Sequence, residues 1–296
     1  MLPFWVSIGL LSLAQGALVA LPRAPAALVL VRLRGRRWAL IPPLSVLGFV
    51  LVAGLAQHAS TQGLTYLALC AVPVLAALAL GWLTPGARPA RALLVPALFA
   101  LAWVDRGGLA GEGAAVVLSA LSCVALGMLL ALVTPARWLA AGIVAMAIAD
   151  IALVVSDELQ RPNSALNAAH PAAGLPRLQS ATFGSAVMGY GDLFIAGTLG
   201  ALLAVAVGRS WQLRAGALAA LLALAFDLLF LLVDELPATV PVALTLIVVM
   251  LARRRRSVRP GRAPAPATSV GPARPRRPRP PGERPSNPAR RAPAAP

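Results

Sequence analysis

The chain has 296 residues, of which 59% are hydrophobic and only 12% are charged, and its net charge at pH 7 is +16. This balance excludes an ordinary soluble domain with one core and is typical of a membrane protein with several spans. All 26 basic residues are arginine, and half of them follow residue 252, so the charge does not form a basic surface along the whole chain. We therefore expect membrane lipid, and no nucleic acid, as a partner.

Apolar runs predict about nine transmembrane helices, because a helix needs about 20 residues to cross the hydrocarbon core. In chain order, the runs are 2–21, 39–56, 64–83, 92–104, 114–133, 138–155, 183–207, 215–233 and 236–252. The first run lacks the basic start of a signal peptide, so we expect it to be an uncleaved span. The expected fold is an all-α polytopic membrane protein.

The arginines predict the orientation of these spans, because short cytoplasmic loops of membrane proteins collect arginine. The loops after spans one, three, five and seven hold ten arginines, and the alternate loops hold three. We therefore expect the N-terminus outside and the C-terminus in the cytoplasm, in the plasma membrane of a bacterium.

Three regions are expected along the chain. Residues 1–137 would form an N-terminal region of five spans, and residues 138–252 a catalytic region of four. Residues 253–296 are rich in proline, arginine and alanine and cannot bury enough apolar surface to offset the entropy of ordering, so we expect a disordered basic tail in the cytoplasm. That tail either rests on anionic lipid or is a solvated segment that fixes the orientation.

Two aspartates lie inside neighbouring apolar spans. Asp150 is in span six, and Asp192 ends the motif Gly189-Tyr190-Gly191-Asp192 in span seven. A carboxylate in hydrocarbon costs several kcal/mol, so an intramembrane aspartate predicts a functional site. Counted from the outer ends of their spans, Asp150 is about five residues deep and Asp192 about six to nine, which is roughly 8–13 Å at the rise of an α-helix. Antiparallel helices would bring both carboxyl groups to one level.

Such a pair has the chemistry of an aspartyl hydrolase. Two carboxyl groups within hydrogen-bonding reach share one proton, because two adjacent like charges are unfavourable. The ionised member would take a proton from an attacking water, and the protonated member would hydrogen-bond the peptide carbonyl. Either aspartate could begin as the base. This chemistry needs no metal and no cofactor, and we expect neither.

With Asp150, the Gly-Tyr-Gly-Asp motif and Leu236-Pro237-Ala238-Thr239, the chain resembles the GxGD intramembrane aspartyl proteases, the presenilin and signal peptide peptidase group. In that family the sixth span carries one catalytic aspartate, the seventh carries GxGD, and a Pro-Ala-Leu motif begins the ninth. The expected orientation is similar to that of signal peptide peptidase. The chain departs from the family pattern at Ala149, where an aromatic residue is usual, and at Thr239, where leucine is usual.

The resemblance implies an endopeptidase that cleaves transmembrane or signal-peptide-like helices, with Asp150 and Asp192 as catalytic residues. It also implies that Pro237, Ala238 and Thr239 shape the site and help to hold an extended substrate. Pro237 could equally be the ordinary proline of a helix start.

The other residues of the motif have physical roles of their own. Gly189 and Gly191 would allow close approach of a helix or substrate. Tyr190 would either orient substrate or pack against a neighbouring helix. Asp227, a third intramembrane carboxylate, is a candidate accessory residue.

Two other functions remain open. One is a prepilin-peptidase-like enzyme, which also uses GxGD but usually has lysine where this chain has Phe194. The other is a proton-coupled transporter in which Asp150, Asp192 and Asp227 relay protons and no bond is cleaved.

Overall fold

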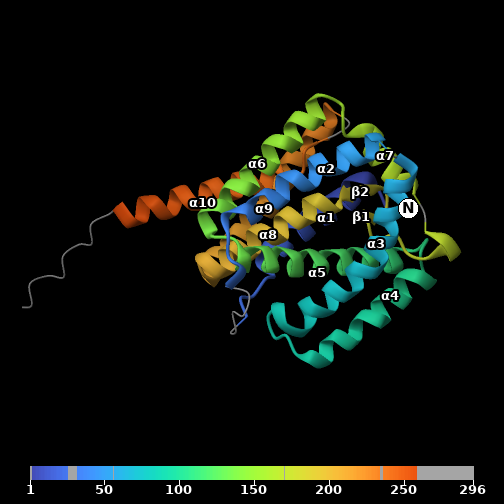
Figure 1. The fold of residues 1–296 in the computed structure, drawn as a ribbon, viewed down its shortest axis with the longest axis horizontal. Helices are drawn as coiled ribbons and strands as arrows, with labels where there is room; N and C mark the ends of the chain where they lie inside the picture. The colour runs from blue at the N-terminus through green and yellow to red at the C-terminus, as the bar shows by residue number, and fades with distance from the viewer. Residues whose placement is uncertain (1, 26–31, 56, 170, 234–235, 259–296) are drawn as a thin grey trace, which may run out of the picture. The chain divides into compact units, whose positions relative to one another are not determined.

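The computed structural model describes residues 2–25, 32–55, 57–169, 171–233 and 236–258. Helices dominate these residues (Figure 1), so the prediction of a mostly helical chain is confirmed. The α-helices are α1 (Phe4–Ala20), α2 (Ile41–Leu55), α3 (Gln57–Leu78), α4 (Leu94–Val104), α5 (Leu109–Val133), α6 (Ala136–Val155), α7 (Gln160–Ala168), α8 (Tyr190–Ala206), α9 (Arg209–Asp227) and α10 (Val240–Val258). Short 3₁₀ or π turns are η2 (Arg36–Leu40), η3 (Ala79–Leu83), η4 (Pro89–Leu93), η5 (Ala172–Gly174) and η6 (Leu228–Leu231).

Four helical segments in the described part of the chain are long and apolar enough to cross a membrane. They are Ala59–Leu83, Leu109–Val133, Ala136–Val155 and Arg209–Leu231. Shorter apolar helices occupy Phe4–Ala20, Pro89–Val104 and Tyr190–Ala206. Each of the nine predicted runs contains a helix, but several of these helices are shorter than a full span, and the count of nine stays a prediction.

The sequence predicted one helix for the seventh apolar run, but the structure has a β-hairpin followed by a helix. Its first part belongs to an antiparallel hairpin of β1 (Ser180–Phe183) and β2 (Ala186–Gly189), which pair from Ser180 with Gly189 to Phe183 with Ala186. Gly184 opens the two-residue turn with a φ of 62°, a conformation that glycine adopts without steric cost. Hydropathy alone missed this break, because β2, with the sequence Ala-Val-Met-Gly, is as apolar as the helix that follows.

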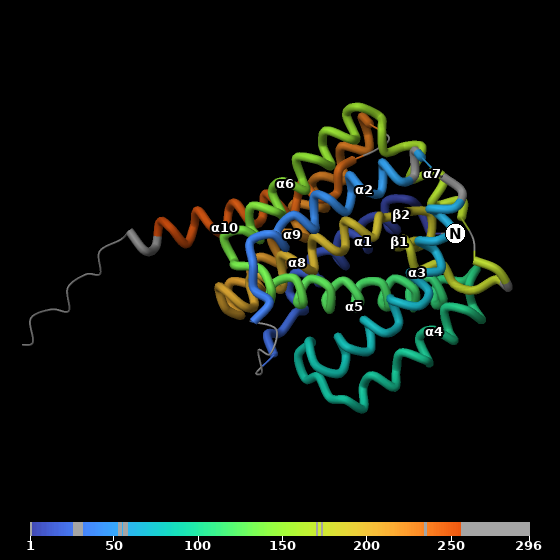
Figure 2. Tube along the Cα trace, in the orientation of Figure 1, coloured from blue at the N-terminus to red at the C-terminus, as the bar shows by residue number. Residues whose placement is uncertain are grey.

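Contacts group residues Met1–Arg253 into one compact unit and Arg254–Pro296 into a second. Within the first unit, helices of the predicted regions 1–137 and 138–252 pack against each other, including α5 against α8 and α1 against both α8 and α9 (Figure 2). The predicted tail begins at residue 253, but α10 continues to Val258. The rest of that tail, 259–296, lies outside the described residues.

Glycines bring α8 close to its neighbours. A Cβ atom on Gly197 would lie 2.6 Å from the carbonyl oxygen of Cys123 in α5, and one on Gly200 would lie 2.5 Å from the carbonyl oxygen of Val19 in α1. Small residues let helix backbones approach in this way, and the dispersion contacts that result hold membrane helices together. Gly197 and Gly200 therefore lie at interhelical contacts, and these contacts hold the helix that carries Asp192.

Candidate active site

Asp150 lies in the last third of α6 and is 7% exposed. Its Oδ2 accepts a hydrogen bond of 2.6 Å from Oγ1 of Thr239, which is fully buried in the segment before α10. Helix α6 and the segment before α10 are thus joined at the Asp150 carboxyl group. The hydroxyl of Thr239 makes this bond, and a leucine at that position could not.

Asp192 is the third residue of α8, in its first helical turn. The helix begins at Tyr190 and not at residue 183 as predicted, because the hairpin occupies the residues that were expected to begin the span. The backbone of Gly189 hydrogen-bonds the Asp192 carboxyl group, and a Cβ on Gly189 would lie 3.0 Å from Oδ2. A carboxylate at this end of a helix is favoured by the unpaired N–H groups and the dipole of the first turn.

The hairpin that leads into Asp192 is anchored at its turn by two helices. The backbone N–H of Gly184 donates to Oε2 of Glu112 in α5 at 2.6 Å, and that of Ser185 donates to Oγ of Ser7 in α1 at 3.3 Å. Hydrogen bonds to α5 and α1 therefore hold the hairpin that leads directly into α8.

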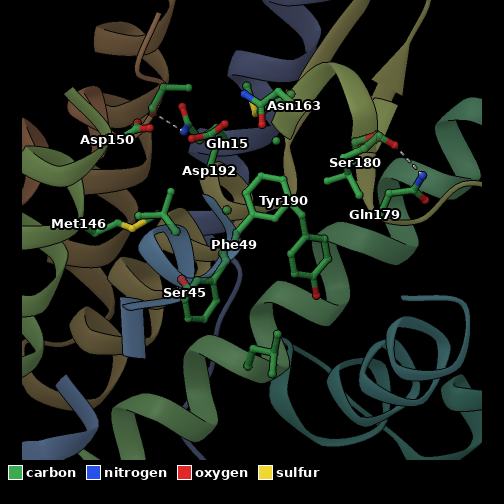
Figure 3. Close-up of a pocket in the computed structure, with 18 of the residues that line it drawn as sticks. Gln15, Ser45, Phe49, Met146, Asp150, Asn163, Gln179, Ser180, Tyr190 and Asp192 are labelled. Atoms are coloured by element: carbon green, nitrogen blue, oxygen red, sulfur yellow. Dashed lines mark hydrogen bonds between the residues drawn. The ribbon is translucent and has the colours of Figure 1, made fainter. Parts of the chain in front are cut away.

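Asp150 and Asp192 line one cavity of about 1010 Å³. Figure 3 shows both side chains in the same part of this cavity, with Gln15 of α1 beside them. The two carboxyl groups are close enough for their charges to interact. The expectation that the neighbouring helices bring both aspartates to one place therefore agrees with the structure.

The cavity is mostly apolar, with a small set of polar groups. Leucine, valine, phenylalanine, alanine and other apolar residues make up most of its wall, and no arginine lines it among the described residues. A largely apolar cavity with a few convergent polar groups is the usual form of a ligand site. The polar lining residues are Ser12, Gln15, Ser45, Asp150, Asn163, Asn167, Gln179, Ser180, Tyr190, Asp192 and Asp227.

Asp227, the predicted accessory residue, lines this same cavity from the last residue of α9. Its Oδ2 accepts a hydrogen bond of 2.7 Å from the hydroxyl of Ser12 in α1. The structure therefore brings all three intramembrane carboxylates to one cavity, although the sequence offers no motif for the third.

The remaining predicted site residues have different surroundings. The Tyr190 hydroxyl is 2.6 Å from the Ser122 hydroxyl of α5, a contact that suits packing better than substrate orientation. Gly191 has only an ordinary contact, with Met146 Cε at 3.7 Å from the position of a Cβ. Ala238 lines the cavity together with its neighbours Leu236 and Pro241.

Pro237 lies just before Val240, the first residue of α10, and its own carbonyl is paired. Its carbonyl oxygen accepts a hydrogen bond of 3.1 Å from the N–H of Val240. This bond replaces the usual helical one, because Pro241 has no N–H to donate.

Sequence reasoning missed Gln15 and Ser12. The amide Nε2 of Gln15 donates to the Ala238 carbonyl oxygen at 2.8 Å, and Ser12 bonds Asp227 as described above. A signal was present, because these two polar residues are three apart in an otherwise apolar run and so share one face of a helix.

Comparisons with protein-family models, curated proteins and solved structures find no match for this chain. The residues and their geometry are therefore the basis for a function. Among the described residues, no three His, Cys, Asp or Glu side chains are grouped so that they could hold a metal ion.

Proposed function

We propose that the chain is an intramembrane aspartyl endopeptidase of the GxGD type, related to the presenilin and signal peptide peptidase group. The observation that carries this proposal is the convergence of Asp150 and Asp192, from α6 and α8, on one largely apolar cavity. The contact of Thr239 with Asp150 supports it further, since this residue belongs to the third motif of the resemblance.

The proposed reaction is hydrolysis of a peptide bond. The ionised aspartate takes a proton from water as the water oxygen bonds to the carbonyl carbon, and the protonated aspartate gives its proton to the carbonyl oxygen. The tetrahedral diol then collapses and the C–N bond breaks. The leaving nitrogen receives the proton that the first aspartate took from water, and the second aspartate takes a proton back from a diol hydroxyl, which restores the pair. The products are one carboxylic acid and one amine.

Strand β2 supports a peptide as the substrate. Its residues Val187, Met188 and Gly189 line the cavity, and it runs directly into the motif that carries Asp192. In the described sheet β2 pairs only with β1, so its second edge can accept an extended peptide. A helix unwound to a strand at this edge would present its carbonyl groups to the two aspartates.

We propose the plasma membrane of a bacterium as the location, with the N-terminus outside and the C-terminus in the cytoplasm. The distribution of arginines between alternate loops supports this orientation. The substrates would then be transmembrane segments or signal-peptide remnants in that membrane.

The first test is cleavage of a helical reporter in liposomes by Asp150→Asn and Asp192→Asn. Each change removes one carboxyl group, so we expect kcat to fall by about 10²–10⁴-fold, the range of general acid–base catalysis. Glu158→Gln is the matched control, because Glu158 is an exposed carboxylate outside the cavity. Wild-type rates in both aspartate variants would refute the assignment.

A proton-coupled carrier is the second candidate, because Asp150, Asp192 and Asp227 all line one cavity. Carboxyl groups in such an arrangement can relay protons. Proton flux in protein-containing liposomes without peptide distinguishes the two functions. A carrier would give flux that Asp227→Asn abolishes, and a hydrolase would give peptide products without flux.

A further inference from the structure

Gln15 is a buried polar residue in the middle of an apolar helix. It is 1% exposed in α1, and its Nε2 donates to the carbonyl oxygen of Ala238 at 2.8 Å. A buried carboxamide is costly unless it is hydrogen-bonded, so this contact determines how the side chain lies. Figure 3 shows the side chain beside both Asp150 and Asp192.

The partner of Gln15 is covalently next to the partner of Asp150. Ala238 precedes Thr239, and the Thr239 hydroxyl donates to Asp150 at 2.6 Å. Gln15, Ala238, Thr239 and Asp150 thus form a continuous connection from α1 to a carboxyl group of the site.

The connected segment needs such a support. Residues 236–239 precede the first residue of α10, and the carbonyl groups of Pro237 and Thr239 accept hydrogen bonds from backbone N–H groups of that helix. The Ala238 carbonyl between them accepts from the Gln15 side chain. A side chain that holds the Ala238 carbonyl therefore also sets the place of the adjoining Thr239 hydroxyl.

Helix α1 is a rigid base for Gln15. A Cβ on the neighbouring Gly16 would lie 2.7 Å from the carbonyl oxygen of Gly216 in α9, so the two helices are in close contact. One turn further along α1, the carbonyl oxygen of Val19 accepts a hydrogen bond of 3.1 Å from Gln212 of α9. A catalytic group positioned from a packed helix is held more accurately than one positioned from a loop.

We propose that Gln15 is a positioning residue of the active site, which holds segment 236–239 so that Thr239 keeps its hydrogen bond to Asp150. The inference rests on the proposed hydrolase function, and it assigns part of the site to the first helix of the chain. Gln15 acts through Ala238 and Thr239 and not on the substrate itself.

The test is Gln15→Met, which keeps the length of the side chain and removes its donor. We expect kcat on a helical reporter to fall about 10–100-fold with KM within about threefold, because a small misplacement of a catalytic group affects the transition state more than substrate binding. An alcohol-containing peptide that mimics the tetrahedral intermediate should lose affinity by a similar factor. Leu13→Ala, an exposed position of the same helix, is the control and should keep wild-type kcat.

A double-mutant cycle with Thr239→Val examines the connection itself. If both residues act through one path, the double variant should be no slower than the slower single variant, because coupled residues are not additive. Thr239→Ser keeps the hydroxyl and should keep kcat within about threefold of wild type. Fully additive losses would overturn the inference.

The remaining outcomes separate this inference from the proposed function. Cleavage by the wild type together with unchanged kcat in Gln15→Met would overturn the role of Gln15 and leave the hydrolase standing. No cleavage by the wild type would overturn both. If Gln15→Met does not fold, Gln15→Asn replaces it, since the shorter amide stays polar but falls short of Ala238, and the same loss of kcat is expected.

Discussion

Thr239 shows how a single residue can depart from a family pattern and still fit the chemistry of the site. Its hydroxyl donates to Asp150, a contact that the leucine usual at this position could not make. In the sequence alone, Thr239 was only a departure from the Pro-Ala-Leu motif of the family that the chain resembles. Its partner lies 89 residues earlier, and a pairing over that separation depends on helix packing that no local pattern encodes.

On the proposed function, Asp227 is an accessory residue and not a member of the catalytic pair, and a substitution at this residue tests that assignment. Asp227→Asn keeps an acceptor for the Ser12 hydroxyl and removes the ionisable group. We expect kcat/KM for a helical reporter to fall less than about tenfold, compared with the losses of about 10²–10⁴-fold that general acid–base residues give. A loss as large as that of Asp192→Asn would instead make Asp227 part of the catalytic machinery.

Among the secondary-structure elements, the hairpin before α8 is the one that hydropathy could not reveal. The hydropathy of the seventh apolar run predicted a helix from residue 183, but α8 begins at Tyr190. Strands β1 and β2 have four residues each, and they are held by the turn at Gly184 and by hydrogen bonds from that turn to α1 and α5. Those anchors are distant in sequence, so the boundary was not available from the run itself.

If an extended substrate pairs with the edge of β2, backbone N–H groups of the substrate near the scissile bond must donate hydrogen bonds to the strand. Single N-methylation of a peptide substrate at these positions should lower kcat/KM about tenfold or more, because each methyl group removes one donor and adds bulk at the strand edge. The measurement is a methylation scan along one peptide.

Methylation far from the scissile bond is the matched control for this scan and should leave kcat/KM unchanged. A flat profile along the whole peptide would contradict strand addition, although it would be compatible with hydrolysis of a peptide bound in another way.

The contact between α1 and α8 gives a prediction about stability. Gly200→Ala would put a methyl group 2.5 Å from the backbone oxygen of Val19, where neither helix can yield easily. We expect a loss of about 1–3 kcal/mol in the free energy of unfolding, the usual cost of overpacking. Thermal or denaturant unfolding in detergent measures it.

Gly63→Ala in α3 is the control for this substitution, because nothing lies within 4 Å of the position of its Cβ. The better helix propensity of alanine should leave the stability unchanged or raise it by up to about 1 kcal/mol. Equal stability of the two alanine variants would show that the contact at Gly200 is looser than described.

For the whole molecule, the proposed orientation can be tested by labelling single cysteines. In a Cys70→Ser, Cys123→Ala background, Glu158→Cys lies between α6 and α7 and Ser210→Cys in the first turn of α9, both at exposed positions. A membrane-impermeant maleimide should label the first in intact cells and the second only after permeabilisation, because arginines mark the cytoplasmic loops. The reverse pattern would invert the proposed topology.

The sequence indicated the class of the molecule and part of its site. The apolar runs predicted helices, which the structure confirms, and the arginine distribution predicted an orientation that the labelling experiment tests. The positions of Asp150 and Asp192 in neighbouring runs predicted that their carboxyl groups lie at one level, and both line one cavity. The contributions of Ser12 and Gln15 were not predicted, because single polar residues in an apolar run are common. Their roles depend on hydrogen-bond partners more than 200 residues later in the sequence.

The bond between Gln15 and Ala238 also has a consequence during biosynthesis. Its two residues are 223 positions apart, so the ribosome releases one near the beginning of translation and the other almost at the end of the membrane-embedded unit. A newly made chain therefore carries both aspartates before segment 236–239 arrives to place Thr239. On the proposed role of Gln15, the incomplete protein cleaves peptides about 10–100-fold more slowly than the finished one.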